Sequence, residues 1–160
     1  MDRRQFGEVA LLSWLGFAGW TPSLSAAPTA KSKVTWQKDL RAAHDVAVEQ
    51  KKPLLLVFGA SWCTFCHKMH RETFTDRNLA AFIEREFIAV TVDFDKDTKV
   101  VETLEVEQLP CTVVLSPEAD LLLKFVGFAK AEPYQKKLQQ ALAKRAEIQL
   151  LQGTETPARR

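Results

Sequence analysis

The sequence predicts an α/β fold in which a mixed central sheet carries helices on both faces. Apolar runs of strand length alternate along the chain with segments of helical periodicity, which is typical of α/β proteins. The last two strand-like runs, residues 111–115 and 121–126, are joined by so short a turn that they must be antiparallel. A Cys-x-x-Cys motif follows the most apolar run where a helical pattern begins.

The first half of the domain is expected to alternate strands and helices. A short strand at residues 34–36 precedes a helix at 38–51, which Pro53 prevents from continuing. Residues 54–58 form a short, wholly apolar run that indicates a buried strand. A helix then runs from the cysteines to about residue 72. The apolar positions of the first helix are Leu40, Ala43, Ala47 and Val48.

The second half continues the alternation. Thr75 or Asp76 can cap a further helix, and residues 87–93 are β-branched and apolar, as a strand requires. A modest helical pattern at 96–104 leads to the strand pair described above. A long helix at 132–150 ends the domain. Its inward-facing residues are expected to be Leu138, Leu142 and Ile148.

The two ends of the chain differ from the domain at residues 31–151. Arg3 and Arg4 precede an apolar run of about a dozen residues, too short for a comfortable membrane span, and small residues follow. We interpret residues 1–30 as a cleavable export signal; a general secretory signal and an uncleaved anchor are the alternatives. Arg3-Arg4-Gln5-Phe6 resembles the core of a twin-arginine signal, although Gly7 and Glu8 depart from that pattern. Residues 152–160 are expected to be a disordered tail.

Composition narrows the functional classes. The chain has 160 residues, 46% of them hydrophobic, and a formal net charge of +2, which gives no indication of a nucleic-acid partner. Its 3 cysteines suffice for one redox pair with one left over, and are too few for a disulfide-stapled scaffold.

The Cys-x-x-Cys pair carries the chemistry. Cys63 stands where helix N–H groups lack partners and the helix dipole is positive, which favours thiolate over thiol. Cys66 lies one turn further and can close a disulfide or resolve a mixed one. A basic cluster, His67, Lys68, His70 and Arg71, follows and should favour the thiolate further.

These residues resemble the thioredoxin superfamily. The resemblance is carried by Phe58, Ala60, Trp62-Cys63-Thr64-Phe65-Cys66, the strand at 87–93, and Val106-Glu107-Gln108-Leu109-Pro110. The continuation Cys66-His67-Lys68-Met69 and then Glu72-Thr73-Phe74-Thr75-Asp76 is similar to an exported thioredoxin-like group. That group includes the periplasmic C-terminal domain of the bacterial transmembrane disulfide reductase.

The resemblance implies a thioredoxin fold and an exported, periplasmic thiol–disulfide oxidoreductase of the reductase or isomerase type. Cys63 would attack and Cys66 would resolve, while Trp62, Leu109 and a cis Pro110 would dock the substrate chain. Protein thiols or disulfides would be the substrates, a membrane or soluble thiol would donate electrons, and no cofactor or metal is expected.

Three positions depart from the family pattern. Val57 replaces a buried acid that helps to move the resolving proton, and His70 replaces another acid. Because His70 lies one turn beyond Cys66, it is a candidate for proton transfer. Cys111 stands where threonine usually follows the cis-proline. It is either a small buried hydrophobe or a third thiol that faces Cys63.

Other readings of the cysteines remain open. The pair could be an inert disulfide in a non-enzymatic scaffold. Cys63, Cys66, His70 and Cys111 could instead bind a metal ion. Cys63 to His67 also matches the Cys-x-x-Cys-His attachment motif of c-type haem, but Met69 is too near to serve as the second axial ligand.

Overall fold

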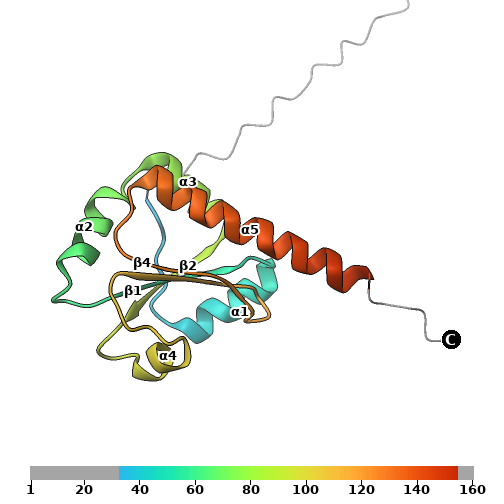
Figure 1. Ribbon diagram of the computed structural model, residues 1–160, viewed down its shortest axis with the longest axis horizontal. Helices are drawn as coiled ribbons and strands as arrows, with labels where there is room; N and C mark the ends of the chain where they lie inside the picture. The colour runs from blue at the N-terminus through green and yellow to red at the C-terminus, as the bar shows by residue number, and fades with distance from the viewer. Residues whose placement is uncertain (1–32, 155–160) are drawn as a thin grey trace, which may run out of the picture.

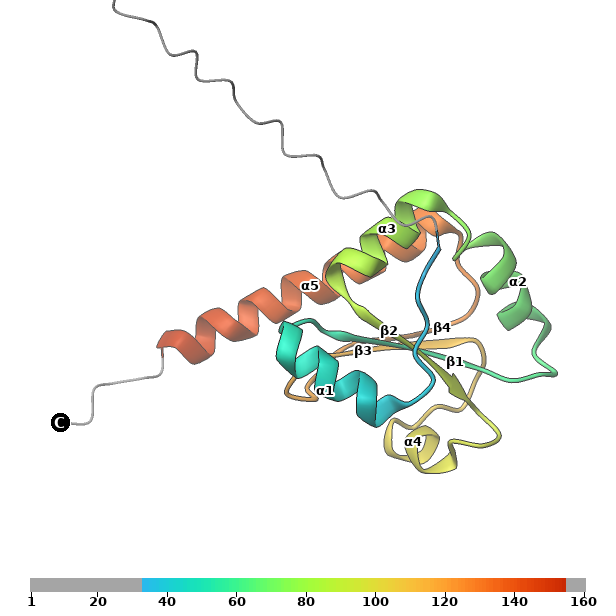
Figure 2. The same ribbon diagram turned by 180° about the vertical axis from the view of Figure 1, so that it is seen from behind.

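The computed structural model describes residues 33–154, so the expected export segment 1–30 and residues 155–160 lie outside the described part of the chain. The described residues form a central sheet with helices on both faces (Figures 1 and 2). This confirms the predicted α/β architecture, which is that of a thioredoxin fold. No helix in this part of the chain is both long enough and apolar enough to span a bilayer.

The sheet is mixed, as the sequence indicates. Its strand order is β2-β1-β3-β4, with β1 parallel to β2 and antiparallel to β3, and with β3 antiparallel to β4. The antiparallel pairing of the last two strands confirms the inference from their short connection. The bounds are Leu54–Gly59 for β1, Ile88–Asp93 for β2, Cys111–Leu115 for β3 and Leu121–Val126 for β4.

Strand β1 separates two hydrophobic cores because its side chains alternate between the faces of the sheet. Leu55 and Val57 join the core beneath α3 and α5, whereas Leu54, Leu56 and Phe58 join the core beneath α1 and α4. Figures 1 and 2 show these two layers, with α2 beside α3. The helices are α1 (Leu40–Gln50), α2 (Thr64–Glu72), α3 (Arg77–Glu86), α4 (Thr98–Thr103) and α5 (Ala131–Thr154).

Side-chain caps fix where two helices begin. The Asp39 carboxylate accepts the N–H groups of Arg41 and Ala42 at the start of α1. Asp76 caps α3 through the N–H of Leu79 at 2.9 Å, which decides between the two caps that the sequence offered. Thr75 instead donates its hydroxyl to the carbonyl of Arg71.

Three expectations about the elements were wrong in part. Residues 34–36 do not form a strand; only Gln37 makes an isolated parallel bridge, to Val90, because the chain turns directly into α1. Val48 was placed on the apolar face of α1 but is 51% exposed. Helix α5 continues to Thr154, so the first three residues of the expected tail, 152–154, are helical.

Candidate functional site

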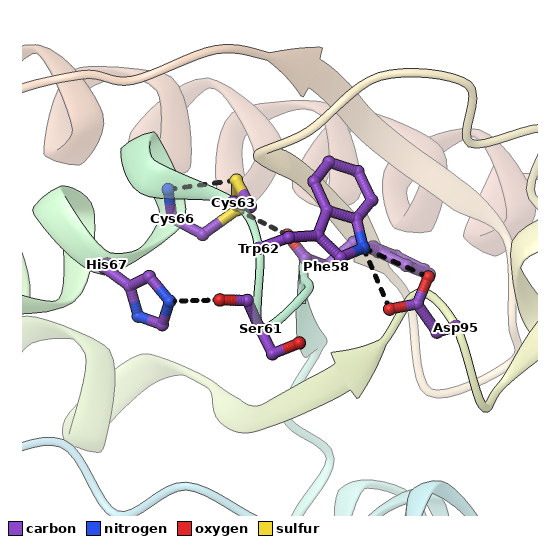
Figure 3. Close-up of a disulfide and its surroundings, with 7 residues drawn as sticks. All are labelled: Phe58, Ser61, Trp62, Cys63, Cys66, His67 and Asp95. Carbon is purple, nitrogen blue, oxygen red and sulfur yellow. Dashed lines mark hydrogen bonds between the residues drawn. A yellow bond between two sulfur atoms is a disulfide. The ribbon is translucent and has the colours of Figure 1, made fainter.

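The two cysteines lie at the start of α2, just beyond the carboxyl end of β1. Cys63 is the N-cap residue of α2, and its sulfur accepts the backbone N–H of Cys66 at 3.1 Å. The two sulfurs are joined in a disulfide (Figure 3). The N–H groups of a first helical turn have no partner within the helix, so they stabilise negative charge there. After reduction, Cys63 is therefore the sulfur better placed to be a thiolate.

Apolar groups enclose both cysteines. Cys63 is 6% exposed and Cys66 is 4% exposed. Ala60 shares a small hydrophobic cluster with them, and Phe94 and Leu109 pack against it. These neighbours cover the two residues almost equally, and Cys63 is only slightly the more exposed of the pair.

The loop before β3 brings Leu109 and Pro110 to this end of the sheet. The Leu109–Pro110 peptide bond is cis, as the resemblance implied. Leu109 packs against the cysteine cluster, while Pro110 is buried and its carbonyl accepts the N–H of Gly127 at 2.7 Å. Leu109 is thus the neighbour of the disulfide, and Pro110 anchors the loop that positions it.

Two large apolar side chains close to the disulfide in the sequence are exposed to solvent. Trp62 is 63% exposed and Phe65 is 58% exposed. The indole N–H of Trp62 donates to the carboxylate of Asp95 at 3.0 Å (Figure 3). The Trp62 ring also makes a T-shaped contact with the ring of Phe94. Asp95 was not singled out from the sequence, because a carboxylate after a strand end is common and only the fold shows its contact with Trp62.

The basic cluster supplies less positive charge to the sulfurs than its sequence suggests. The ammonium group of Lys68 lies over the ring of Phe128, 4.8 Å from its centroid, and so is engaged away from the disulfide. His67 donates its Nε2 proton to the carbonyl of Ser61 at 2.8 Å (Figure 3). His70 has a pKa below its ordinary value, mainly because burial disfavours its charged form and also because His67 is near.

The ring of His70 is held in an aromatic cluster while part of the residue remains exposed. It meets the edges of Trp36 and Phe74, with ring centroids 5.5 Å and 5.2 Å away. Neither ring nitrogen forms a hydrogen bond with another of the described residues. At neutral pH the side chain is therefore an uncharged base whose nitrogens are available to solvent.

A hollow of about 560 Å³ lies between α2, the end of β1 and the segment that follows β2. Cys66 and His70 both line it, so the structure brings the expected resolving cysteine and the candidate proton carrier to one space. Val57, which stands where the family has an acid, also lines it and supplies no proton donor or acceptor. The other lining residues are Lys38, Gly59, Ala60, Ser61, His67, Thr91, Val92, Asp93, Lys96 and Asp97.

Cys111 belongs to a hydrophobic core that borders the cysteine cluster, since Phe94 and Leu109 pack against both. It is fully buried at the start of β3, paired with Phe58 of β1, and belongs to the cluster beneath α1 and α4. Burial raises the pKa of its thiol, an effect that nearby Lys124 opposes. These surroundings support the interpretation of Cys111 as a small buried hydrophobe.

The structure gives no support to a metal centre. Within the described part of the chain, no three or more His, Cys, Asp or Glu side chains are grouped so that they could hold a metal ion. Cys63, Cys66, His70 and Cys111 therefore do not form such a group in this disulfide-bonded state, and Cys111 belongs to the core beneath α1 and α4.

Comparison with known proteins places this site in a family. The thioredoxin-like domain family matches residues 40–142. The chain is 27% identical over 141 residues to the thioredoxin-related protein DsbJ of Chlamydia pneumoniae, covering 80% of this chain and 40% of that protein. It is 27% identical over 128 residues to the thiol:disulfide interchange protein DsbD of Ralstonia nicotianae, covering 75% of this chain and 21% of DsbD. It therefore spans less than half the length of these two relatives.

The fold has a counterpart among solved structures. The DsbH oxidoreductase superimposes with a TM-score of 0.65 at 22% identity, covering 79% of this chain and 96% of that one. The family match extends over more than half of the chain and includes β1, both cysteines and the cis-proline. The chain belongs to the thioredoxin-like domain family.

Proposed function

We propose that this chain is an exported thiol–disulfide oxidoreductase whose Cys63–Cys66 pair reduces or isomerises disulfides in other proteins. The observation that carries the proposal is the Cys63 sulfur at the N-cap of α2, where it accepts the N–H of Cys66. Export rests on the N-terminal segment with Arg3 and Arg4.

The reaction begins at Cys63. Its thiolate attacks a substrate disulfide, one substrate sulfur leaves, and a mixed disulfide forms. Trp62 and Leu109 offer apolar contacts for the substrate chain beside the sulfurs, and the backbone next to Pro110 docks it. Cys66 then attacks the Cys63 sulfur of the mixed disulfide. The second substrate sulfur leaves as a thiol, and the Cys63–Cys66 disulfide of this chain is formed. A membrane or soluble thiol returns the electrons.

A reductase or isomerase suits this site better than a strong oxidant. Strong oxidants of this class have a reduced form that is specially stabilised, chiefly through the thiolate. Here the N-terminus of α2 stabilises the Cys63 thiolate. The ammonium group of Lys68, however, lies over the ring of Phe128, and His70 is neutral at pH 7, so neither adds positive charge near the sulfur. The limited positive charge near Cys63 therefore supports a potential in the reducing to isomerising range.

His70 is the proposed carrier of the resolving proton. Cys66 must lose its proton before it attacks, and Val57 cannot accept it. The neutral ring of His70 shares the hollow with Cys66, so a water molecule there can connect them.

The proposal is tested by trapping. In the Cys66→Ser variant, the Cys63 thiolate should attack a protein disulfide and the mixed disulfide should accumulate, since nothing resolves it. The Cys63→Ser variant is the matched control and should trap nothing. Trapped species are separated by non-reducing electrophoresis and the linked cysteine is identified by peptide mapping. A Cys66→Ser variant that captures no disulfide-containing protein, with Cys63 labelled no faster than a free thiol, would leave only a structural disulfide.

A further inference from the structure

The side chain of Lys124 links β4 to the end of α4. Its ammonium group donates to the carbonyls of Leu104 and Glu105, at 2.9 Å and 2.6 Å. Leu104 is the C-cap residue of α4, and Glu105 follows it in the left-handed conformation, with φ 51°. Carbonyls at a helix end lack partners within the helix, and a cation is favourable there. Lys124 therefore holds the chain where α4 ends.

Strand pairing directs Lys124 toward α4. Lys124 lies opposite Val113 in the antiparallel pair of β4 and β3, and opposed side chains lie on the same face of a sheet. Val113 belongs to the core beneath α1 and α4. The side chain of Lys124 thus leaves the sheet on the face that α4 covers, although the residue as a whole is exposed.

A second contact from this part of the chain holds the other end of the loop before β3. We call residues 106–110 the docking loop, and its last residue, Pro110, accepts the N–H of Gly127 at 2.7 Å. Gly127 directly follows β4. The short stretch 124–127 therefore holds the docking loop at both ends, through the Lys124 side chain at Glu105 and through the backbone at Pro110.

The middle of the docking loop has few contacts of its own. Glu107, Gln108 and Leu109 form no hydrogen bond with any other residue in the described part of the chain. Glu107 and Gln108 are exposed, whereas Leu109 packs against the cluster that contains Cys63 and Cys66. The place of Leu109 beside the cysteines therefore depends on how the two ends of the loop are held.

The start of the loop follows the position of α4, which is itself loosely packed. Val106 donates its N–H to the carbonyl of Val101 in α4 at 2.9 Å, so the loop begins on the last turn of that helix. Helix α4 has 6 residues, none of them buried, and its contact with the core is made by the partly buried Val100 and Val101. So short a helix depends on links such as the one from Lys124 to keep its end in place.

We propose that Lys124 is a positioning residue for substrate binding, which holds the end of α4 and so keeps the docking loop in the conformation that receives a substrate chain. This inference rests on the proposed oxidoreductase function and deepens it. A loop that adopts the binding conformation for only part of the time lowers the apparent affinity by that fraction. The bound substrate still reacts at the same rate, because the hydrogen bonds of Lys124 go to the end of α4 and not to the cysteine pair.

The first test separates binding from chemistry. Lys124→Met keeps a comparable apolar stem but removes the donor. Insulin serves as the disulfide probe, and its rate of reduction by the full chain is measured against insulin concentration at saturating dithiothreitol, with the uncatalysed rate subtracted. The KM for insulin should rise by roughly two- to tenfold, the size of one ordinary net hydrogen bond, with kcat unchanged. An unchanged KM, or a loss confined to kcat, overturns the proposal.

The second test asks whether the donor at this position is responsible. Lys124→Arg keeps a charged donor and should retain the wild-type KM, whereas Lys124→Gln, with a shorter side chain, should raise it as Lys124→Met does. Lys144→Met is the matched control, because Lys144 also donates to a backbone carbonyl of β4, that of Leu121, at 3.2 Å and at the other end of the strand. Thermal unfolding checks that each variant is folded. An equal rise in KM for Lys144→Met, or for Lys124→Arg, contradicts the role of Lys124.

The third test examines the loop and the thiolate directly. In Lys124→Met, amide hydrogen exchange in residues 104–110 should be faster than in the wild type and in Lys144→Met. The rate at which iodoacetamide alkylates Cys63 in the reduced protein should have the same pH dependence in all three. A shifted pH dependence in Lys124→Met would mean that the charge of Lys124 acts on the thiolate, and this would overturn the positioning role.

The outcomes separate this inference from the proposed function. If the wild-type chain reduces insulin and the folded Lys124→Met and Lys124→Gln variants keep its KM, only the role of Lys124 is refuted. If the wild-type chain reduces no insulin and Cys66→Ser traps no protein disulfide, the proposed function itself fails.

Discussion

Removing the hydroxyl of Tyr134 should destabilise the domain through a single buried hydrogen bond. Tyr134 and Thr112 are 0% and 1% exposed, and their hydroxyl groups lie 3.0 Å apart. The bond joins α5 to β3, and the Tyr134 ring also meets Phe74 and Phe125. In Tyr134→Phe the ring contacts remain, but the Thr112 hydroxyl loses the only side-chain partner that it has in the described structure.

The magnitude follows from the burial of both groups. A buried hydroxyl left without a partner costs about 1–3 kcal/mol, so Tyr134→Phe should lower the free energy of unfolding by that amount. Thr112→Val should lower the free energy of unfolding by about as much, because it leaves the buried Tyr134 hydroxyl without its hydrogen-bond partner. The double variant removes both polar groups and should be close to the wild type. The two losses should therefore fail to add, and the coupling should approach the sum of the two single losses, about 2–6 kcal/mol.

Urea unfolding followed by tryptophan fluorescence and by circular dichroism measures these values. The four proteins should share one m-value, so that differences in midpoint report stability alone. Strictly additive losses, with the double variant as unstable as the sum of the singles, would show that the hydroxyl pair is not coupled and would refute the reasoning.

Two further predictions concern titratable groups near the site. The pKa of His70 is lower in the folded protein than its unfolded value of 6.5, so folded protein binds fewer protons there. Stability should therefore rise as pH increases from below that lowered pKa to about 6.5; urea midpoints of His70→Gln should lack this component, and an identical pH profile would contradict it. Burial raises the pKa of Cys111, so its thiol should resist alkylation at pH 8 until urea unfolds the chain. Rapid labelling in the native state, or a Cys63–Cys111 disulfide under mild peroxide, would show that Cys111 is accessible instead.

Local sequence patterns were sufficient to predict the strand and the helix that position the two cysteines. The apolar run that forms β1 and the cysteines at the start of α2 are adjacent in sequence, so strand propensity and helix-start chemistry place them together. The cis bond at Pro110 was anticipated only through the family resemblance, because a cis X–Pro bond has no local signal strong enough to predict it.

Contacts between distant segments could not be predicted in the same way. The basic cluster was expected to act as a unit, but Lys68 packs on Phe128 and His70 packs on Trp36, partners that only the fold brings near. The hollow likewise depends on Gly59 standing opposite Cys66 across β1 and α2. An isolated glycine after a strand indicates a turn or a close approach, but not what approaches it.

The contact between Trp36 and His70 has a practical consequence for attaching this domain to another protein or to a surface. It places the first described residues next to the last turn of α2, whereas the last turn of α5 lies at the far end from α2 in both views (Figures 1 and 2). A fusion partner or immobilising linker joined near residue 33 would lie close to Trp36 and to His70, which lines the hollow. The same linker joined after α5 would lie away from α2 and its cysteines, so that end is the one to use for tethering.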